Sequence, residues 1–345
     1  MPMRSSMVRS VLIGATAALA VLGAAFLAWQ RLGPRPVTVR IGKFPEQFAY
    51  VRSADDVVNG GAMFTPPKES TKSIAVLWIH GWGANFYSPT YVMIGRALAE
   101  HGLTSISANT RMHDIANVQQ YRSGKRVRGG GYWGLPSEQV RDIAAWIDFA
   151  GTLGFTRIVL VGHSAGWAAV RAYQAETQDS RVAGLVLASG QVQPTSEAPD
   201  QKLIAQATRF VQDGRGDDLL QLPNRSFPSF ISAATFLDDA NTPPDILDFF
   251  GVRTGDGAVT RVRCPLLAFF GTRNDVGTNE DLKLLESSIK RLQRGPRSVS
   301  TAMIQEADHM YTGEEAQVAT VISGWIDSAI LAESRREPGM DNAPR

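Results

Sequence analysis

The sequence is nearly without cysteine, since Cys264 is the single one among 345 residues. One cysteine cannot form an internal disulfide, and it cannot build the thiolate cluster of a structural zinc site. A large excess of one charge is also missing, because 35 basic residues face 33 acidic ones and the formal net charge is +2. Without a basic excess, the composition argues against a nucleic-acid partner.

Apolar residues, in contrast, are plentiful, because they make up 44% of the chain while charged residues make up 20%. Both fractions are typical of soluble globular proteins and exclude a chain that is disordered throughout. A length of 345 residues suits one large domain or two ordinary ones, and no internal repeat is visible. We therefore expect a folded body with a sizeable hydrophobic core.

A long uncharged apolar run occurs at the N-terminus, where Val11 to Trp29 follow Arg4 and Arg9. As a helix, this run of about 19 residues would measure about 28 Å, close to the hydrocarbon thickness of a bilayer. We predict that residues 1–35 form an N-terminal hydrophobic helix that anchors the protein in a membrane. The alternative is a signal peptide cleaved near Ala18-Leu19-Ala20, which would release a secreted or periplasmic protein. Basic residues flank both ends of the run, so the side of the membrane stays open.

Residues 36–334 read as one domain in which buried-strand and helix patterns alternate. Two short extended segments are expected first, at 37–41 and 48–52. Further strands are expected at 73–79, 103–108, 157–161, 182–189, 265–270 and 299–304. Helices are expected at 89–101, 165–177, 279–292 and 314–331, with one more beginning after a Ser137 cap. Strands in series with helices call for a parallel sheet covered on both faces, a three-layer α/β/α sandwich.

Three stretches depart from this alternation. Residues 190–263 mix polar segments with short apolar helical patterns, and we expect them to form a cap insertion over the edge of the sheet. Residues 111–136 form a long irregular stretch, which we call the basic loop, with a basic cluster between Arg122 and Arg128. This cluster suits an anionic headgroup or acid substituent, and equally a solvated loop. The polar residues 335–345 are expected to be a disordered tail.

A nucleophile motif stands where the strand at 157–161 meets the following helix. The residues there are Gly162-His163-Ser164-Ala165-Gly166, which match G-x-S-x-G. The strand-to-helix turn of such a motif is so tight that small residues are required on both sides of the serine, which the turn exposes at the carboxyl edge of the sheet. We therefore predict Ser164 as a catalytic nucleophile.

A serine hydroxyl needs a base within hydrogen-bonding reach, and the chain has five histidines. His163 neighbours Ser164 in a position that directs its ring away from the hydroxyl. His80 follows the first buried strand, His101 ends a helix and His113 lies in the basic loop. Only His309 follows the last expected strand, from which a loop can bring its ring over the same sheet edge as Ser164. We predict His309 as the base.

The base itself needs a carboxylate on its other ring nitrogen, which fixes one tautomer and stabilises the cation. Asp275 lies just beyond the strand at 265–270 and is our prediction for this role. Glu280 and Asp281 are nearby competitors, although acidic residues are also favoured at the start of the next helix. Asp248, in the insertion, is a more distant alternative.

The oxyanion that forms when a serine attacks a carbonyl needs two preorganised donors. One is normally the backbone N–H after the nucleophile, which is that of Ala165 here. The second is expected in His80-Gly81-Trp82-Gly83, with the Trp82 N–H as the first choice, because flanking glycines let the backbone come close to a substrate. An ordinary glycine-rich turn between a strand and a helix would have the same sequence pattern.

These motifs together resemble the α/β-hydrolase superfamily, in which the nucleophile, the acid and the histidine follow one another in this order. The resemblance covers roughly residues 74–331 and includes His80-Gly81-Trp82-Gly83 and Gly271 to Asp275. It implies an eight-stranded, mostly parallel sheet with a cap between the sixth and seventh strands. It also implies that no metal and no organic cofactor is required. Members that open epoxides or displace halide carry aspartate at the nucleophile position, so Ser164 disfavours those reactions.

The sequence therefore predicts a membrane-associated serine hydrolase for a small-molecule acyl substrate, acting through Ser164, His309 and Asp275. A carboxylic ester is the expected substrate, with a thioester or amide as variants. Acyl transfer to another acceptor is an alternative, and a catalytically silent hydrolase-like membrane scaffold is a second. The substrate's identity and the oligomeric state are beyond the sequence.

Overall fold

The structure is a computed structural model that describes residues 46–68, 73–193, 200–223 and 228–332. The hydrophobic segment at 1–35, the extended segment expected at 37–41 and the tail at 335–345 lie outside the described residues. Within the described ranges, no helix has both the length and the apolar character needed to cross a membrane.

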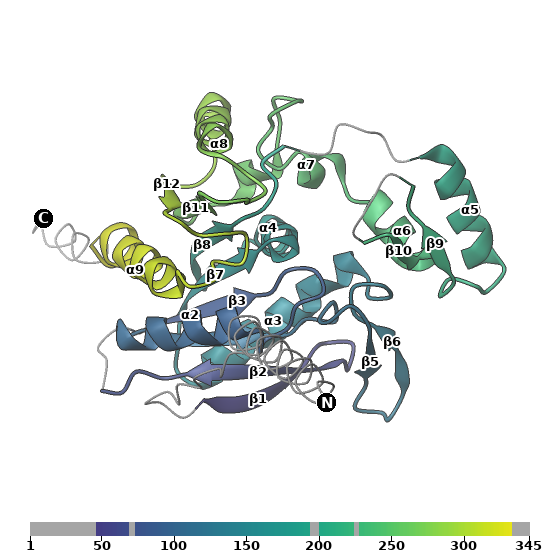
Figure 1. Ribbon diagram of the computed structural model, residues 1–345, viewed down its shortest axis with the longest axis horizontal. Helices are drawn as coiled ribbons and strands as arrows, with labels where there is room; N and C mark the ends of the chain where they lie inside the picture. The colour runs from purple at the N-terminus through teal and green to yellow at the C-terminus, as the bar shows by residue number, and fades with distance from the viewer. Residues whose placement is uncertain (1–45, 69–72, 194–199, 224–227, 333–345) are drawn as a thin grey trace, which may run out of the picture. The chain divides into compact units, whose positions relative to one another are not determined.

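A sheet of eight strands forms the centre of the described chain (Figure 1). In order across the sheet, the strands are β1 (Gln47–Arg52), β2 (Val58–Phe64), β4 (Thr104–Ala108), β3 (Ile74–Ile79), β7 (Arg157–His163), β8 (Val182–Ala188), β11 (Leu266–Gly271) and β12 (Val299–Ile304). The strands from β4 to β12 pair in parallel, whereas β2 runs antiparallel to both β1 and β4. The sheet is therefore mostly parallel, as the resemblance implies.

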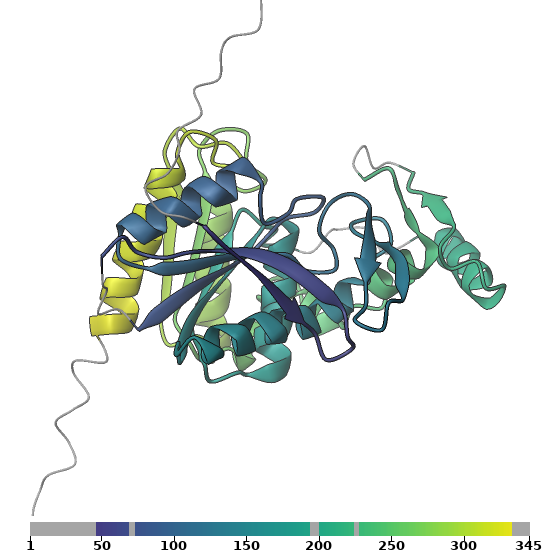
Figure 2. The same cartoon turned by 90° about the horizontal axis from the view of Figure 1, so that it is seen from below.

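Helices cover both faces of this sheet, as Figure 2 shows. One face carries α2 (Pro89–Glu100) and α9 (Glu315–Trp325), and the π-helical turn η3 (Ile326–Leu331) continues α9. The other face carries α3 (Gln139–Thr152), α4 (Ala165–Thr177) and α8 (Asn279–Leu292). Coverage on both sides explains why β3, β7, β8 and β11 read as nearly continuous apolar runs rather than as alternating ones.

Strand β3 shows how one strand serves both layers. Its alternate residues Ala75, Leu77 and Ile79 belong to the core cluster with α3, α4 and α8. The residues between them, Ile74, Val76 and Trp78, belong to the cluster with α2 and α9. Successive side chains of a strand point to opposite faces, so six consecutive buried residues tie the sheet to both layers of helices.

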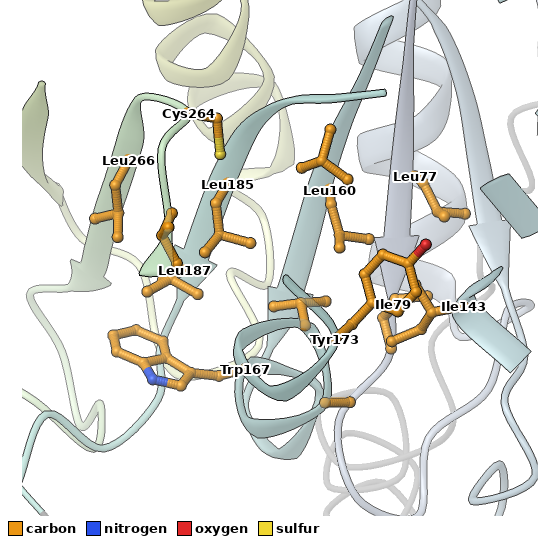
Figure 3. Close-up of a cluster of buried hydrophobic side chains, with 14 of the residues drawn as sticks. Leu77, Ile79, Ile143, Leu160, Trp167, Tyr173, Leu185, Leu187, Cys264 and Leu266 are labelled. Atoms are coloured by element: carbon orange, nitrogen blue, oxygen red, sulfur yellow. The ribbon is translucent and has the colours of Figure 1, made fainter. Parts of the chain in front are cut away.

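Helix α4 is fixed to the sheet by its large side chains, which matters because the helix begins directly after Ser164. In Figure 3, Trp167 extends from α4 toward Leu187 of β8, whereas the ring of Tyr173 lies beside residues of β3 and α3. Both side chains are at most 2% exposed. Burying an aromatic side chain of this size contributes about 2–3 kcal/mol, so the start of α4 is held firmly against the sheet.

The insertion expected at 190–263 lies between β8 and β11, the sixth and seventh strands of the sheet in chain order. Its described elements are α5 (Gln201–Gln212), β9 (Leu219–Gln221), β10 (Phe230–Ser232), α6 (Ala233–Ala240), α7 (Pro244–Leu247) and η2 (Ala258–Arg261). Ala207, Leu220 and Ala233 form a small core of their own between α5, α6 and the β9–β10 hairpin.

The insertion is attached to the end of the basic loop and to the residue that follows it. Ser232 N–H donates to the carbonyl oxygen of Tyr132 over 2.8 Å, and the Ser137 hydroxyl donates to Asp238 Oδ1 over 2.6 Å. The expectation that Ser137 caps a helix was wrong. Ser137 lies in the 3-10 turn Pro136–Glu138, and α3 begins two residues later. The carboxylate of Asp238 supplies a partner for this hydroxyl that sequence spacing does not reveal.

Candidate active site

Ser164 lies at the tight turn between β7 and α4. Its φ of 53° and ψ of −120° lie in a region that costs a non-glycine residue of the order of 1–3 kcal/mol. The neighbouring glycines make this turn sterically possible. A Cβ on Gly162 would lie 2.4 Å from the carbonyl oxygen of Gly166, and a Cβ on Gly166 would lie 2.6 Å from the carbonyl oxygens of Ile79 and His80. Gly162 therefore lets α4 start directly against β7, and Gly166 lets the same turn approach the end of β3.

His309 lies in the loop after β12, and its ring reaches the serine. His309 Nε2 is 3.1 Å from Ser164 Oγ, and His309 Nδ1 is 2.8 Å from Asp275 Oδ1. A carboxylate can only accept, so Nδ1 carries the proton and donates it to Asp275. Nε2 is then left with a lone pair that can accept the serine hydroxyl proton. The structure thus brings together three residues that lie far apart in the sequence.

Asp275 accepts four hydrogen bonds. Its Oδ1 accepts from His309 and from Val276 N–H, and its Oδ2 accepts from Gly271 N–H and from the Ser189 hydroxyl. Burial alone would raise the pKa of this carboxyl, but hydrogen bonds led by that of His309 outweigh burial and hold the pKa below its usual value. A charged carboxylate is therefore maintained against the histidine ring.

The loops that carry Asp275 and His309 meet at Gly271, the last residue of β11. A Cβ on Gly271 would lie 2.3 Å from the carbonyl oxygen of Ala307. Only a residue without a side chain allows this approach, and the approach places His309 over Asp275.

The other acidic candidates are occupied elsewhere. Asp281 accepts from Thr278 N–H over 2.9 Å and completes the capping box at the start of α8. Glu280 lies in the first turn of the same helix. Asp248 accepts from the backbone of Val252 and Thr254 and stabilises its own loop. Of these four carboxylates, Asp275 is the one that is hydrogen-bonded to His309.

Two supporting residues of Asp275 could not be found from motifs. The Ser189 hydroxyl donates to Asp275 Oδ2, so the Tyr311 hydroxyl donates to Ser189 Oγ in turn. Ser189 directly follows β8 and Tyr311 lies two residues after His309. Both positions were visible in the sequence, but nothing in the residue types distinguished a supporting hydroxyl from an ordinary one.

His163 is hydrogen-bonded to the backbone of His309 rather than to Ser164 Oγ. His163 Nε2 donates to the carbonyl oxygen of His309 over 2.8 Å. Its Nδ1 then accepts from the Tyr91 hydroxyl over 2.8 Å, and Tyr91 Oη accepts from Gly81 N–H over 3.1 Å. Burial, reinforced by the nearby His309, lowers the pKa of His163 to about 4, so this chain of hydrogen bonds contains a neutral imidazole. It connects the loop after β3 to the loop of His309.

The remaining histidines have structural partners. His80 donates from Nδ1 to the Gly81 carbonyl oxygen and accepts at Nε2 from Thr110 N–H, and burial lowers its pKa to about 4. His101 follows α2 and its Nε2 lies 3.4 Å from Thr320 Oγ1. His113 Nδ1 lies 2.8 Å from Asp114 Oδ2.

The loop His80-Gly81-Trp82-Gly83 lies directly against the serine. A Cβ on Gly81 would lie 2.9 Å from Ser164 Cβ, so a side chain there would collide with the nucleophile. The Trp82 side chain donates from Nε1 to the Gly131 carbonyl oxygen over 3.2 Å, which fastens this loop to the glycine-rich end of the basic loop. Ala165 is the first residue of α4, and the amides of a first helical turn lack acceptors within the helix.

A pocket of about 260 Å³ opens beside Ser164. Its walls come from the start of α4, the segment after β8 and the loop of Asp275, and the lining residues are Ser164, Ala165, Trp167, Ala168, Arg171, Ser189, Gly190, Gln191 and Val276. A larger pocket of about 430 Å³ lies at the amino ends of β7, β8 and β11, remote from the serine. In the described part of the chain, no group of three or more His, Cys, Asp or Glu residues is arranged to hold a metal ion.

The basic cluster lies on a short hairpin that the sequence did not reveal. Strands β5 (Asn117–Gln120) and β6 (Arg126–Gly129) pair antiparallel, and most of their residues are exposed or half-buried. Lys125 lies 5.1 Å above the ring of Tyr121, and Arg128 lies 5.5 Å from the ring of Trp133. These cation–π contacts hold two of the basic side chains to the hairpin's own aromatic residues.

Comparison with known proteins identifies the family. A family model described as the alpha/beta hydrolase fold matches residues 74–260. The chain belongs to this family of alpha/beta hydrolases. A search of curated proteins found no match.

Solved structures of the same fold are similar over most of the chain. A complex of DcsB with its substrate analogue has 14% identity and a TM-score of 0.61, and covers 83% of this chain and 100% of that one. A thermostable carboxyl esterase from Bacillus coagulans has 15% identity and a TM-score of 0.58, covering 84% and 100%. Est1E from Butyrivibrio proteoclasticus has 17% identity and a TM-score of 0.54, covering 82% and 99%. At these identities the similarity concerns the fold alone.

Proposed function

We propose that this protein is a serine hydrolase that cleaves carboxylic esters through an acyl-enzyme intermediate. The observation that carries the proposal is the continuous line of hydrogen bonds from Asp275 through His309 to Ser164. Nucleophile, base and orienting carboxylate are the three groups that acyl transfer to a serine requires. One of the structurally similar proteins, the carboxyl esterase from Bacillus coagulans, is an esterase by name, which agrees with this proposal.

In the first half of the reaction, Ser164 Oγ attacks the carbonyl carbon of the ester while His309 Nε2 takes the hydroxyl proton. The carbonyl π electrons move to oxygen, and the backbone N–H groups of Ala165 and Trp82 stabilise that oxyanion. Removal of one such donor typically costs about 3–4 kcal/mol of transition-state stabilisation. The oxyanion then collapses, the bond to the alkoxy group breaks, and His309 returns its proton to the departing alcohol.

In the second half, water replaces the alcohol. His309 takes a proton from the water molecule as its oxygen attacks the acyl carbon, and the bond to Ser164 Oγ breaks when the second tetrahedral intermediate collapses. The carboxylic acid leaves and Ser164 regains its proton. Asp275 stays ionised throughout and stabilises the imidazolium that forms twice in each cycle.

The direct test is covalent labelling of folded protein with a fluorophosphonate probe, followed by peptide mapping. We expect one adduct on Ser164 and none in the Ser164→Ala variant, with hydrolysis of short-chain p-nitrophenyl esters lost in parallel. Folded wild-type protein that neither reacts with the probe nor hydrolyses any ester would contradict the proposal. Product that forms only when an alcohol acceptor is added would instead assign acyl transfer.

We also propose that residues 1–35 anchor this hydrolase in a membrane and that residues 36–334 form its catalytic domain. Both proposals rest on the apolar run from Val11 to Trp29 and on where the alternating pattern begins. Cell fractionation combined with N-terminal sequencing tests them. The intact N-terminus in the membrane fraction is the expected result, and a mature chain that begins near Val21 would contradict the anchor.

A further inference from the structure

The pocket beside Ser164 contains a buried positive charge that the proposed mechanism does not use. Arg171 lines this pocket and is 9% exposed. Among the described residues it has no hydrogen bond or ion pair, and its Nε is buried without an acceptor. Unpaired charges are rarely retained in protein interiors, because removal from water is costly unless an opposite charge compensates.

The guanidinium group of Arg171 contacts an aromatic ring. Arg171 Cζ lies 5.1 Å from the ring centroid of Phe249, which belongs to the insertion. A cation–π contact is weaker than a charge-assisted hydrogen bond to a carboxylate and supplies no acceptor for the N–H groups of the guanidinium. Burial lowers the pKa of Arg171 to about 10, so the side chain remains a cation at neutral pH.

The position of Arg171 on α4 relates it to the nucleophile. Ala168 and Arg171 lie four and seven residues after Ser164, so the three share one face of the helix start, and all three line the pocket. Two helical turns separate Arg171 from Ser164 by about 10 Å along the axis. Helical side chains lean toward the N-terminus, which directs Arg171 back toward the serine.

We propose that Arg171 determines specificity by binding a carboxylate group of the substrate, so that the preferred substrates are esters that carry a free carboxylate. The planar guanidinium fork matches the two oxygens of a carboxylate. Among the described residues that line the pocket, no other side chain is charged. The pocket therefore neutralises one negative charge of a ligand and leaves a second one uncompensated. This composition favours a carboxylate over a phosphate dianion. The inference rests on the proposed esterase function and specifies its substrate class.

Two matched pairs of substrates test the inference and separate a charge on the acyl side from one on the alcohol side. Monoethyl adipate is compared with ethyl 5-carbamoylpentanoate, in which an amide replaces the carboxylate. On the alcohol side, 4-acetoxybenzoate is compared with 4-acetoxybenzamide. In wild-type protein, kcat/KM for the carboxylate member of at least one pair should exceed that of its amide by about 30-fold or more.

Variants assign this preference to the side chain. In Arg171→Met the ratio of the two kcat/KM values should fall to near one, and Arg171→Lys should restore part of it because the charge returns without the planar fork. Lys283→Met, which removes an exposed charge from α8, should keep the wild-type ratio. A wild-type ratio near one for both pairs, or an unchanged ratio in Arg171→Met, would overturn the inference while leaving ester hydrolysis standing.

Binding without turnover gives an independent readout. In a Ser164→Ala background, monoethyl adipate or 4-acetoxybenzoate should raise the Tm in a saturable manner, and the corresponding amide should not. The additional Arg171→Met substitution should abolish this shift. If no ester is hydrolysed, a shift that depends on Arg171 still supports the anion site and only the proposed function fails. Equal shifts for the carboxylate and the amide, a shift retained in the double variant, or no shift with either carboxylate would overturn the anion site.

Discussion

At the scale of single residues, the glycines around Ser164 set the geometry of the site. Gly162, Gly166 and Gly81 each lie where a Cβ would approach the backbone or the nucleophile within 3 Å. The absence of a side chain at these positions therefore allows β3, β7 and the start of α4 to lie close together. The G-x-S-x-G pattern predicted that small residues are required beside Ser164, and the structure shows which atoms each glycine approaches.

Replacement of Gly166 by alanine tests this requirement. The new Cβ would lie 2.6 Å from two backbone carbonyl oxygens, so α4 must shift away from β3 and carry Ser164 with it. We expect a loss of about 1–3 kcal/mol in the free energy of unfolding and a roughly 100-fold loss in kcat/KM. Chemical denaturation and ester kinetics measure both.

Gly324→Ala is the matched control, because Gly324 lies in α9 and a Cβ added there would have nothing within 4 Å. Alanine there should be neutral or stabilise the helix by up to about 1 kcal/mol. Similar kinetics for Gly166→Ala and wild type would show that the close contact is not required.

Asp275 can be tested against the neighbouring acid Asp281. In Asp275→Asn the amide cannot satisfy the same four donors, and the His309 tautomer that presents a lone pair to Ser164 is no longer enforced. A fall in kcat of about 10⁴-fold is expected, as for a triad that loses its carboxylate. Asp281→Asn should change kcat little, because this residue caps α8. A comparable fall in kcat for both variants would contradict the assignment.

The three central residues could be predicted to lie at one sheet edge because each follows a segment that the alternating pattern identifies as a strand of a parallel sheet. Their roles in catalysis stay predictions until the variants are measured. Ser189 and Tyr311 could not be predicted, because their contribution depends on hydroxyl orientation at the ends of two different segments. The structural contacts of His163 likewise depend on the distant Tyr91.

At the scale of elements, a buried ion-pair network holds the basic loop to α3. Arg111 is 1% exposed, and its Nε donates to Asp142 Oδ2 over 2.9 Å. Asp142 also accepts from Asn59 Nδ2 over 3.0 Å, which links the network to β2. The further carboxylates that accept from Arg111 belong to Asp55 and Glu138. The first residue of the irregular stretch is therefore fixed by neighbours from separate segments.

Asp142→Ala tests how much this network contributes to the free energy of unfolding. Removal of one partner leaves the Arg111 charge buried and less compensated, and a loss of about 3–5 kcal/mol in the free energy of unfolding is expected. Arg141→Ala, which breaks exposed pairs with Asp55 and Glu138, should cost less than about 1 kcal/mol. Denaturation that ranks the two variants in the opposite order would show that the buried pair contributes little.

Several elements followed from the sequence and others did not, for physical reasons. The limits expected for α4, α8 and β12 agree with the structure, because apolar periodicity and terminal residues define them. Strand β2 was missed because it contains Gly60 and Gly61, which weaken a strand pattern, although Gly61 is needed where a Cβ would lie 2.5 Å from the Trp146 ring. The β5–β6 hairpin was missed because its exposed residues give no buried alternation.

At the scale of the whole molecule, the two buried histidines make folding dependent on pH. The pKa of His80 and of His163 is lowered to about 4 by burial, from 6.5 for a free histidine. Between these values the unfolded chain binds protons that the folded protein does not. The free energy of unfolding should therefore decrease as pH falls from about 6.5 to about 4, by ~3 kcal/mol for each histidine.

Urea denaturation at pH 7.5, 5.5 and 4.5 measures this dependence. The lowered pKa of Asp275 acts in a separate window, because that carboxylate loses its stabilising effect only when pH falls below its ordinary value of 3.8. His163→Gln should remove about half of the slope between pH 6.5 and pH 4, and Lys283→Met should leave the slope as it is. A slope that His163→Gln does not change would contradict a buried neutral imidazole.

The central claim is that Ser164 becomes acylated with the help of His309. Rapid quenching of the protein with a p-nitrophenyl ester, followed by intact and peptide mass spectrometry, measures this directly. We predict an acyl adduct on Ser164 that forms in the first turnover, and at least about 10³-fold slower acylation in His309→Ala. Turnover of the ester without an adduct on Ser164, or acylation at an unchanged rate in His309→Ala, would contradict it.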